Sequence, residues 1–159
     1  MTRLYGRALY GNRCVDAAPH GHWKTTTMLS SIRLDGSTEC VVFDGAVNAE
    51  IFRINREKML APRLRDDDVV VMDNLSAYKD QKVIVLIEQR GARVLLLPAY
   101  SPDFNPIEKM WSKVKQILRS IKARSQETLL KAIATALDAV TAQDAKGWFA
   151  SCGYSSFQN

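Results

Sequence analysis

Two acidic residues stand where a sheet protein can use them for chemistry. Asp73 directly follows the apolar run 69–72, and Glu108 lies in the first turn of a predicted helix that begins at Pro106. Because α/β sheets place functional side chains at the C-terminal ends of buried strands, the two carboxylates could face each other across one sheet edge. Paired carboxylates repel unless a divalent cation compensates their charge, and their oxygens suit Mg²⁺ or Mn²⁺. Such ions can activate a water or a 3′-hydroxyl and stabilise the leaving oxygen of a phosphodiester.

Each carboxylate also has a structural interpretation. Asp73 could cap the following turn through Asn74 and Ser76. The residues from Asn105 to Glu108 have the form of a capping box, in which an acidic residue three positions after the N-cap closes the start of the helix. Without further context, capping is favoured over catalysis for Glu108.

Hydrophobic patterning predicts the elements that would precede these residues. Residues 25–34 and 38–43 have the composition of two strands joined by a tight turn, so a hairpin is expected. A helix is predicted from about residue 48 to residue 60, and Pro62 ends it.

The second half of the chain predicts two more strands and three helices. The unbroken apolar runs 69–73 and 93–97 are typical of strands buried on both faces, and residues 79–90 between them are favoured as a crossover helix. Asn105 is a plausible N-cap and Pro106 a favoured first residue for a long amphipathic helix. Two further helices follow, so the chain is predicted to be α/β around a small mixed sheet.

Length and composition indicate one globular domain over residues 1–159. The chain is 47% hydrophobic and 25% charged, which argues against disordered and fibrous classes. No apolar run approaches the ~18 residues that a membrane helix needs, so no membrane partner is expected. The three cysteines are odd in number and far apart, which favours a reduced, cytoplasmic protein.

The excess positive charge is local. Residues 105–131 carry seven cations and two anions, and this net +5 equals the formal charge of the whole chain. A local basic segment is expected of a protein that binds a polyanion such as nucleic acid, although a solvated helix face has the same composition.

A family resemblance appears over the same residues. The stretch 97–115 (LPAYSPDFNPIEKMWSKVK), with 69–79 (VVVMDNLSAYK) before it, resembles the catalytic domain of bacterial insertion-sequence transposases of the mariner superfamily. These belong to the DDE group, whose fold is ribonuclease H-like. The 34 residues between Asp73 and Glu108 are similar to the superfamily's spacing of its second and third acidic residues. The resemblance covers most of the chain and is decisive over about 69–121.

The resemblance implies a ribonuclease H-like mixed sheet flanked by helices, with a metal site for DNA cleavage. Asp73 and Glu108 would be metal-binding carboxylates, holding two Mg²⁺ (or Mn²⁺) ions in the complete site. Asn74, Asn105 and Pro106 match the family's flanking positions and would orient the carboxylates.

The implied partner is DNA. The protein would cleave phosphodiesters at transposon ends and join the freed 3′-hydroxyl to target DNA, as a homodimer at the bacterial nucleoid. Phosphate contacts are expected from the basic face of the helix after Glu108, through Lys109, Lys113 and Lys115.

One departure from the family pattern concerns the first catalytic Asp, which the family carries on its first strand, before the hairpin. The chain opens at Met1 just past that position, so the domain is expected to lack its first strand and first metal ligand. The alternative function is therefore a catalytically inactive remnant that binds DNA or full-length transposase as a regulator. A third possibility is the downstream half of a frame-interrupted gene.

Overall fold

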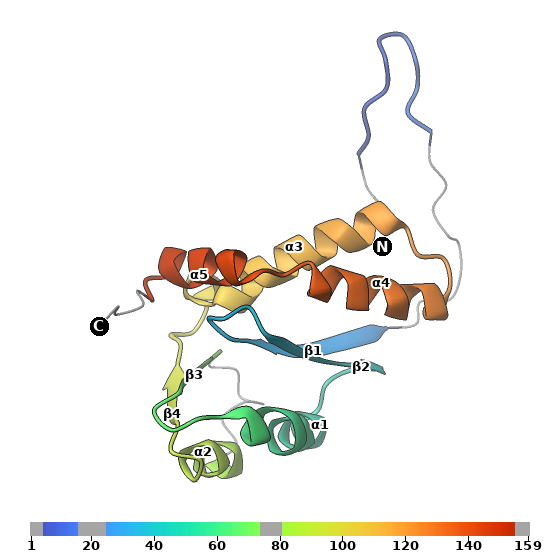
Figure 1. The fold of residues 1–159 in the computed structure, drawn as a ribbon. Coiled ribbons are helices and arrows are strands. Elements are labelled where there is room, and N and C mark those ends of the chain that lie inside the picture. Colours follow the sequence, from blue (N-terminus) through green and yellow to red (C-terminus); the bar gives the residue numbers. More distant parts are fainter. Residues whose placement is uncertain (1–4, 16–24, 74–80, 155–159) are drawn as a thin grey trace.

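The structure is a computed structural model that describes residues 5–15, 25–73 and 81–154 (Figure 1). The predicted α/β class is confirmed, because helices alternate with two small sheets in the order that hydrophobic patterning indicates. The elements are β1 (Thr26–Ile32), β2 (Thr38–Asp44), α1 (Ala49–Asn55), a π turn (Arg56–Leu60), a 3₁₀ turn (Ala61–Arg63), β3 (Val69–Met72), α2 (Gln81–Glu88), β4 (Arg93–Leu96), a second 3₁₀ turn (Pro102–Phe104), α3 (Pro106–Ile121), α4 (Gln126–Asp138) and α5 (Ala142–Ser151).

The predicted hairpin is present as the antiparallel pair β1–β2. Its register runs from Thr26 opposite Asp44 to Ile32 opposite Thr38. At the turn, Asp35 Oδ1 accepts hydrogen bonds from the Ser37 hydroxyl and backbone N–H, at 2.6 and 2.9 Å, and these bonds lower the pKa of Asp35. The local side-chain bonds therefore fix the turn that the sequence indicates.

The second sheet is the parallel pair β3–β4, joined through the crossover helix α2 that the sequence favours. Its register runs from Val69 opposite Arg93 to Met72 opposite Leu96. The prediction that both strands are covered on both faces is wrong, because Val69 is 50% exposed and Leu95 is 43% exposed. A ladder only two strands wide cannot be enclosed by the elements around it, and one edge of β3 borders a cleft.

Two hydrophobic cores hold these parts together. The first joins α3 and α4 and receives apolar side chains from the hairpin; its fully buried members are Met110, Val114 and Ala136. The second lies around β3 and α2 and contains Phe52, Val83 and Ile87. In Figure 1 the helices α3, α4 and α5 lie on one side of the hairpin, and α1 and α2 lie on the other.

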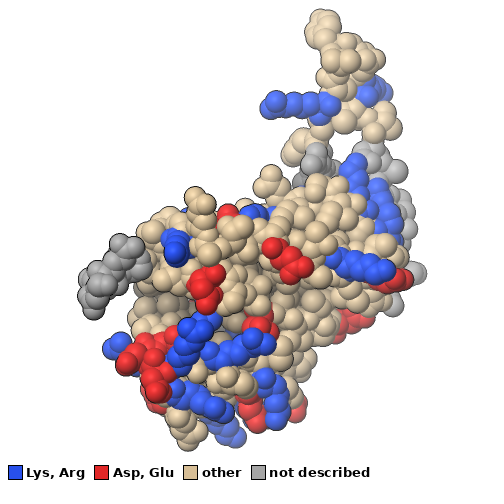
Figure 2. All heavy atoms as spheres, in the orientation of Figure 1, with Lys and Arg blue, Asp and Glu red and all other residues tan. Residues whose placement is uncertain are grey.

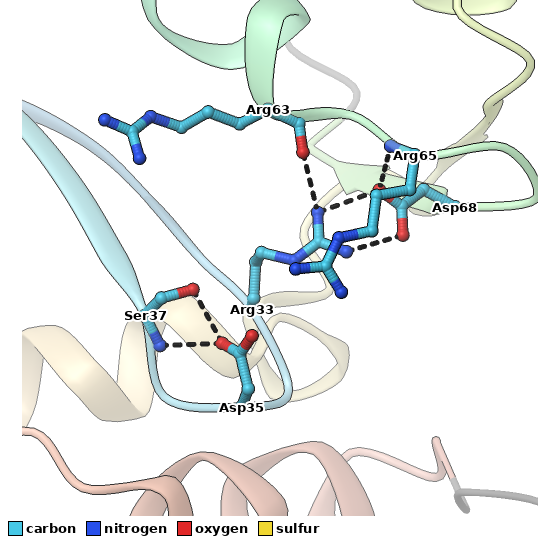
Figure 3. A network of polar contacts seen from close by, with 6 residues as sticks. All are labelled: Arg33, Asp35, Ser37, Arg63, Arg65 and Asp68. Atoms are coloured by element: carbon cyan, nitrogen blue, oxygen red, sulfur yellow. Dashed lines mark hydrogen bonds and ion pairs between the residues drawn. The ribbon is translucent and has the colours of Figure 1, made fainter.

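Within the described part of the chain, no strand pairing joins the β1–β2 ladder to the β3–β4 ladder. The arrangement is consistent with a ribonuclease H-like fold that lacks a full sheet. A bidentate contact joins the ladders at one end, where Arg33 Nη1 and Nη2 donate to the Asp68 carboxylate at 2.8 and 2.7 Å (Figure 3). This guanidinium lowers the pKa of Asp68. None of the described helices is long and apolar enough to cross a membrane.

Candidate active site

Asp73 directly follows β3, at the end of the strand where the sequence places it. Its side chain is half-buried, and its Oδ1 accepts a hydrogen bond from Asn105 Nδ2 at 3.0 Å. The parallel pairing of β3 with β4 brings the loop that follows β4 to the same end of the ladder. Asp73 and Asn105 are 32 positions apart in the chain, and this hydrogen bond joins them.

Asn105 connects Asp73 to the start of α3. It is only 7% exposed and is the N-cap of the helix, where its Oδ1 accepts from the Ile107 backbone N–H at 3.4 Å. Pro106 follows at the first helical position, where its missing N–H costs no helical hydrogen bond. The amide of Asn105 thus uses its oxygen for the helix and its nitrogen for the carboxylate.

Glu108 stands in the first turn of α3 with an exposed side chain. Its backbone N–H donates to Asn105 O at 3.1 Å, but within the described residues its carboxylate accepts no hydrogen bond. Reciprocal capping boxes occur instead at the starts of α4 and α5. The capping-box interpretation of Glu108 is therefore wrong, and its carboxylate is available for another role.

One cleft of about 840 Å³ brings the two predicted acidic residues together. Asp73 and Glu108 both line it, as do Asn105, Pro106 and Trp111. The described residues contain no group of three or more Asp, Glu, His or Cys placed to hold a metal ion. Asp73 and Glu108 thus share one cleft, whose lining also includes Asp35, Glu39 and Asp68.

These two carboxylates fit the donor chemistry of one Mg²⁺ ion. Magnesium is commonly held by one or two carboxylates, with water and substrate phosphates completing the octahedron. A hydrogen bond that orients a ligating carboxylate, as Asn105 orients Asp73, is typical of metal sites. The second ion that the resemblance implies would need ligands beyond Asp73 and Glu108. Asn74, the other expected orienting residue, lies outside the described residues.

The three lysines expected at phosphates are placed differently. Lys113 Nζ donates to Asp144 Oδ2 at 2.6 Å and to Ala139 O at 2.8 Å, so it joins α3 to α5. Lys109 is half-buried, and Lys115 is exposed. Lys115 is seven residues after Glu108, which places both on the same face of α3, about 10 Å apart along its axis.

The surface around α3 is basic at one end. Lys and Arg side chains gather over its C-terminal part on the face that Figure 2 shows, whereas the lower part of that face mixes both signs. The last turn of α3 and the residues after it supply Arg119, Lys122 and Arg124. The basic segment of the sequence therefore extends away from the cleft that holds Glu108.

Arg56 is one of the cations that line the cleft, and the sequence pattern did not predict its position. Arg56 is 9% exposed and stacks on Phe52, with its guanidinium carbon 4.4 Å from the ring centroid. An arginine within an amphipathic segment is ordinarily assigned to the surface. Arg56 is the first residue of the π turn at residues 56–60, and periodicity does not reveal such a turn.

Comparison with known proteins identifies a family. A family model described as DDE superfamily endonuclease matches residues 1–130, which include both carboxylates, all four strands and α3. Enzymes of this superfamily act on DNA and generally use divalent metals. No curated protein matches the chain. With its family model matched over most of its length, the chain belongs to the DDE endonuclease superfamily.

Proposed function

We propose that this chain is the catalytic part of a bacterial insertion-sequence transposase of the mariner superfamily. Its reaction would be metal-dependent cleavage of DNA phosphodiesters followed by strand transfer. The supporting observation is that Asp73 and Glu108 line one cleft while Asn105, bonded to Asp73, begins the helix that carries Glu108.

Each residue at the cleft has a distinct proposed role. Asp73 and Glu108 would hold Mg²⁺ or Mn²⁺, which when bound supplies charge stabilisation for the attacked phosphate. Asn105 keeps the Asp73 carboxylate in one orientation, because its amide is itself fixed at the helix start. Asn105 itself is 7% exposed.

The DNA backbone would cross the face of α3 that carries Glu108. Lys115 is exposed on that face, so its ammonium can reach a phosphate without giving up a bond within the protein. Lys109 is a second candidate, and Lys113 would first have to leave Asp144. By resemblance, the DNA would be transposon ends and target, brought together by a homodimer at the nucleoid.

The experiment is cleavage of end-containing DNA with Mg²⁺ or Mn²⁺, combined with Mn²⁺ binding measured by electron paramagnetic resonance. Asp73→Asn and Glu108→Gln should each abolish cleavage and weaken Mn²⁺ binding. The matched control is Asp103→Asn. Asp103 is an exposed acid in the 3₁₀ turn before α3, and it does not line the cleft. Cleavage that survives in Asp73→Asn would rule out the proposed site.

A second candidate function is a catalytically inactive regulator that binds DNA or full-length transposase. It is favoured by one observation, that the described residues contain no group of three or more Asp, Glu, His or Cys placed to hold a metal ion. This function predicts salt-dependent DNA binding with no cleavage in either metal. The two candidates therefore differ in a single assay.

A further inference from the structure

The last helix, α5, is bonded to α3 and to the turn before it, once near each of its own ends. At its start, Asp144 accepts a hydrogen bond from Lys113, in the middle of α3. Beyond its end, the Tyr154 hydroxyl donates to Phe104 O, in the 3₁₀ turn before α3, at 2.9 Å. Helix α5 therefore runs antiparallel to the first half of α3, and Figure 1 shows it beside that half. Asp144 and Tyr154 both lie beyond residues 1–130, which the family model matches.

A local backbone motif places Tyr154 at the end of α5. Gly153 has a φ of +89°, a left-handed conformation that glycine adopts without strain. Its N–H donates to Ala150 O at 3.0 Å, and the next N–H, that of Tyr154, donates to Phe149 O at 2.9 Å. These two bonds form a Schellman motif, which brings the residue after the glycine back against the helix. The Tyr154 ring accordingly meets the Phe149 ring edge to face, with the ring centroids 6.1 Å apart.

The carbonyl that Tyr154 binds belongs to the peptide unit directly before Asn105. The N–H of this unit, that of Asn105, donates to Pro102 O at 2.9 Å, while its oxygen, Phe104 O, accepts from Tyr154. Because a peptide unit is planar and includes the next α-carbon, the two bonds together fix the point from which the Asn105 side chain extends. That side chain binds Asp73 and caps α3. Tyr154 is thus connected to the Asp73 carboxylate through one peptide unit and one amide.

The surroundings of Tyr154 keep its hydroxyl a donor and join it to the cleft. The side chain is half-buried, and burial raises the pKa of Tyr154, so the phenol stays protonated throughout the neutral pH range. Phe149, against which its ring packs, itself lines the cleft that contains Asp73. One tyrosine therefore supports both a side of the cleft and the loop that carries Asn105.

We propose that Tyr154 is a positioning residue of the active site, which makes the end of α5 a part of that site. The inference rests on the proposed metal site at Asp73 and Glu108. Without the Tyr154 hydroxyl, the peptide unit before Asn105 can turn, so that only a fraction of the molecules hold Asp73 in the orientation that binds metal. The apparent metal affinity falls in proportion to that fraction.

The test compares Mn²⁺ binding by the whole chain with and without the Tyr154 hydroxyl. Tyr154→Phe keeps the ring that packs on Phe149 and removes only the donor. Titration followed by electron paramagnetic resonance should show an affinity about two- to tenfold weaker, the factor expected for one net hydrogen bond. Tyr100→Phe makes the same change at a fully exposed tyrosine between β4 and α3, and it should leave the affinity unchanged. Unchanged affinity in Tyr154→Phe, or an equal loss in Tyr100→Phe, would overturn the proposal.

Amide hydrogen exchange of the metal-free chain, followed by NMR, gives a second readout. The reporter is the Ile107 N–H, which the Asn105 side chain binds, and the control is the Thr128 N–H, which the Ser125 side chain binds at the start of α4. Tyr154→Phe should accelerate exchange at the reporter by about two- to tenfold relative to the control. Equal changes at the two amides would mean that the tyrosine only stabilises the fold, and the positioning role would be wrong.

Gly153→Ala tests the same connection from the backbone. Alanine is strained at this φ, so the substitution should displace Tyr154 while leaving its hydroxyl intact. The loss of Mn²⁺ affinity should match that of Tyr154→Phe, and the double variant should lose no more than either single variant, whereas additive losses would contradict a shared route. If the wild-type chain binds no Mn²⁺, the proposed metal site is wrong, and exchange at Ile107 still decides whether Tyr154 positions Asn105.

Discussion

The starts of α3 and α5 look alike in sequence and are used in opposite ways. Each has a polar N-cap followed three residues later by an acid, Asn105 with Glu108 and Thr141 with Asp144. At α5 the pair is closed. The Thr141 hydroxyl accepts from the Asp144 N–H at 3.1 Å, and Asp144 Oδ2 accepts from the Thr141 N–H at 2.9 Å.

Asp144 Oδ2 also accepts a hydrogen bond from Lys113 Nζ at 2.6 Å. This bond is the main reason that the pKa of Asp144 falls from 3.8 to about 2, and the bonds from Thr141 add to it. The acid at the start of α5 is therefore committed to holding helices together. Its Oδ2 accepts bonds from Lys113 and from the Thr141 hydroxyl and backbone N–H.

At α3 the N-cap amide turns toward Asp73, and Glu108 is left without a described partner. The difference arises from the N-cap side chain. An asparagine carries its donor and its acceptor on two different atoms, so its oxygen can serve the helix while its nitrogen reaches a neighbouring carboxylate. The comparison teaches that an acid at this helix position is functional or structural according to what its N-cap binds.

The largest expected difference is in metal binding by the two acids. Glu108→Gln should weaken Mn²⁺ binding at least about 100-fold, because loss of a direct ligand exceeds the 10–100-fold cost of losing an outer-sphere partner. Asp144→Asn is the matched control and should leave binding within about twofold, since its charge is already neutralised by Lys113. Titration followed by electron paramagnetic resonance measures both. Equal effects of the two substitutions would mean that the helix starts do not differ in this way.

The next effect separates capping from orientation at Asn105. Asn105→Ser keeps a good N-cap but removes the amide nitrogen that donates to Asp73, so Mn²⁺ affinity should fall about 10–100-fold with little loss of stability. Asn105→Ala should show the same loss of affinity and also about 1 kcal/mol less stability. Mn²⁺ titration and urea unfolding of both variants measure the two quantities. Full affinity in Asn105→Ser would show that the hydrogen bond does not position Asp73.

The sequence predicted most of the elements, because their signals are local. The hairpin turn, the start of a helix at about residue 48 and the amphipathic pattern of α3 each depend on residues a few positions apart, and each is confirmed. The crossover helix α2 was favoured over a strand on topology, although its segment is β-branched. Tertiary context decided that case in the direction expected for parallel strands.

The partial exposure of β3 and β4 could not be predicted from the sequence. An apolar run indicates that a strand can be buried, but it does not indicate whether other elements cover both of its faces. The ion pair of Lys113 with Asp144 could not be predicted either. Its partner Asp144 is 31 residues away and belongs to another helix start. The positions of Asp73 after a strand and Glu108 at a helix start indicated that the two could face each other, but local patterns favoured capping for Glu108, and the resemblance favoured a metal site.

A smaller effect is expected in stability at the start of α5. Asp144→Asn should lower the free energy of unfolding by about 1 kcal/mol, after allowance for partial exposure of the pair. The folded-state pKa lies below its ordinary value, so this contribution is complete above the ordinary pKa of 3.8 and is lost as the pH falls toward about 2. Urea unfolding at several pH values between 2 and 7 measures it. A difference between wild type and variant that grew as the pH fell would have the wrong sign.

The smallest expected effect concerns the cations on the two sides of α3. Lys115→Ala should reduce the slope of log affinity for DNA against log salt by about one, because an exposed lysine that binds one phosphate releases about one counterion. Lys113→Ala is the comparison, since its ammonium is bonded to Asp144 and Ala139 O. It should leave the slope unchanged and lower stability. Fluorescence anisotropy between 50 and 200 mM salt distinguishes these outcomes. If Lys113→Ala changed the slope and Lys115→Ala did not, DNA would have to approach the α5 side of α3, and the face that carries Glu108 would lose its proposed role.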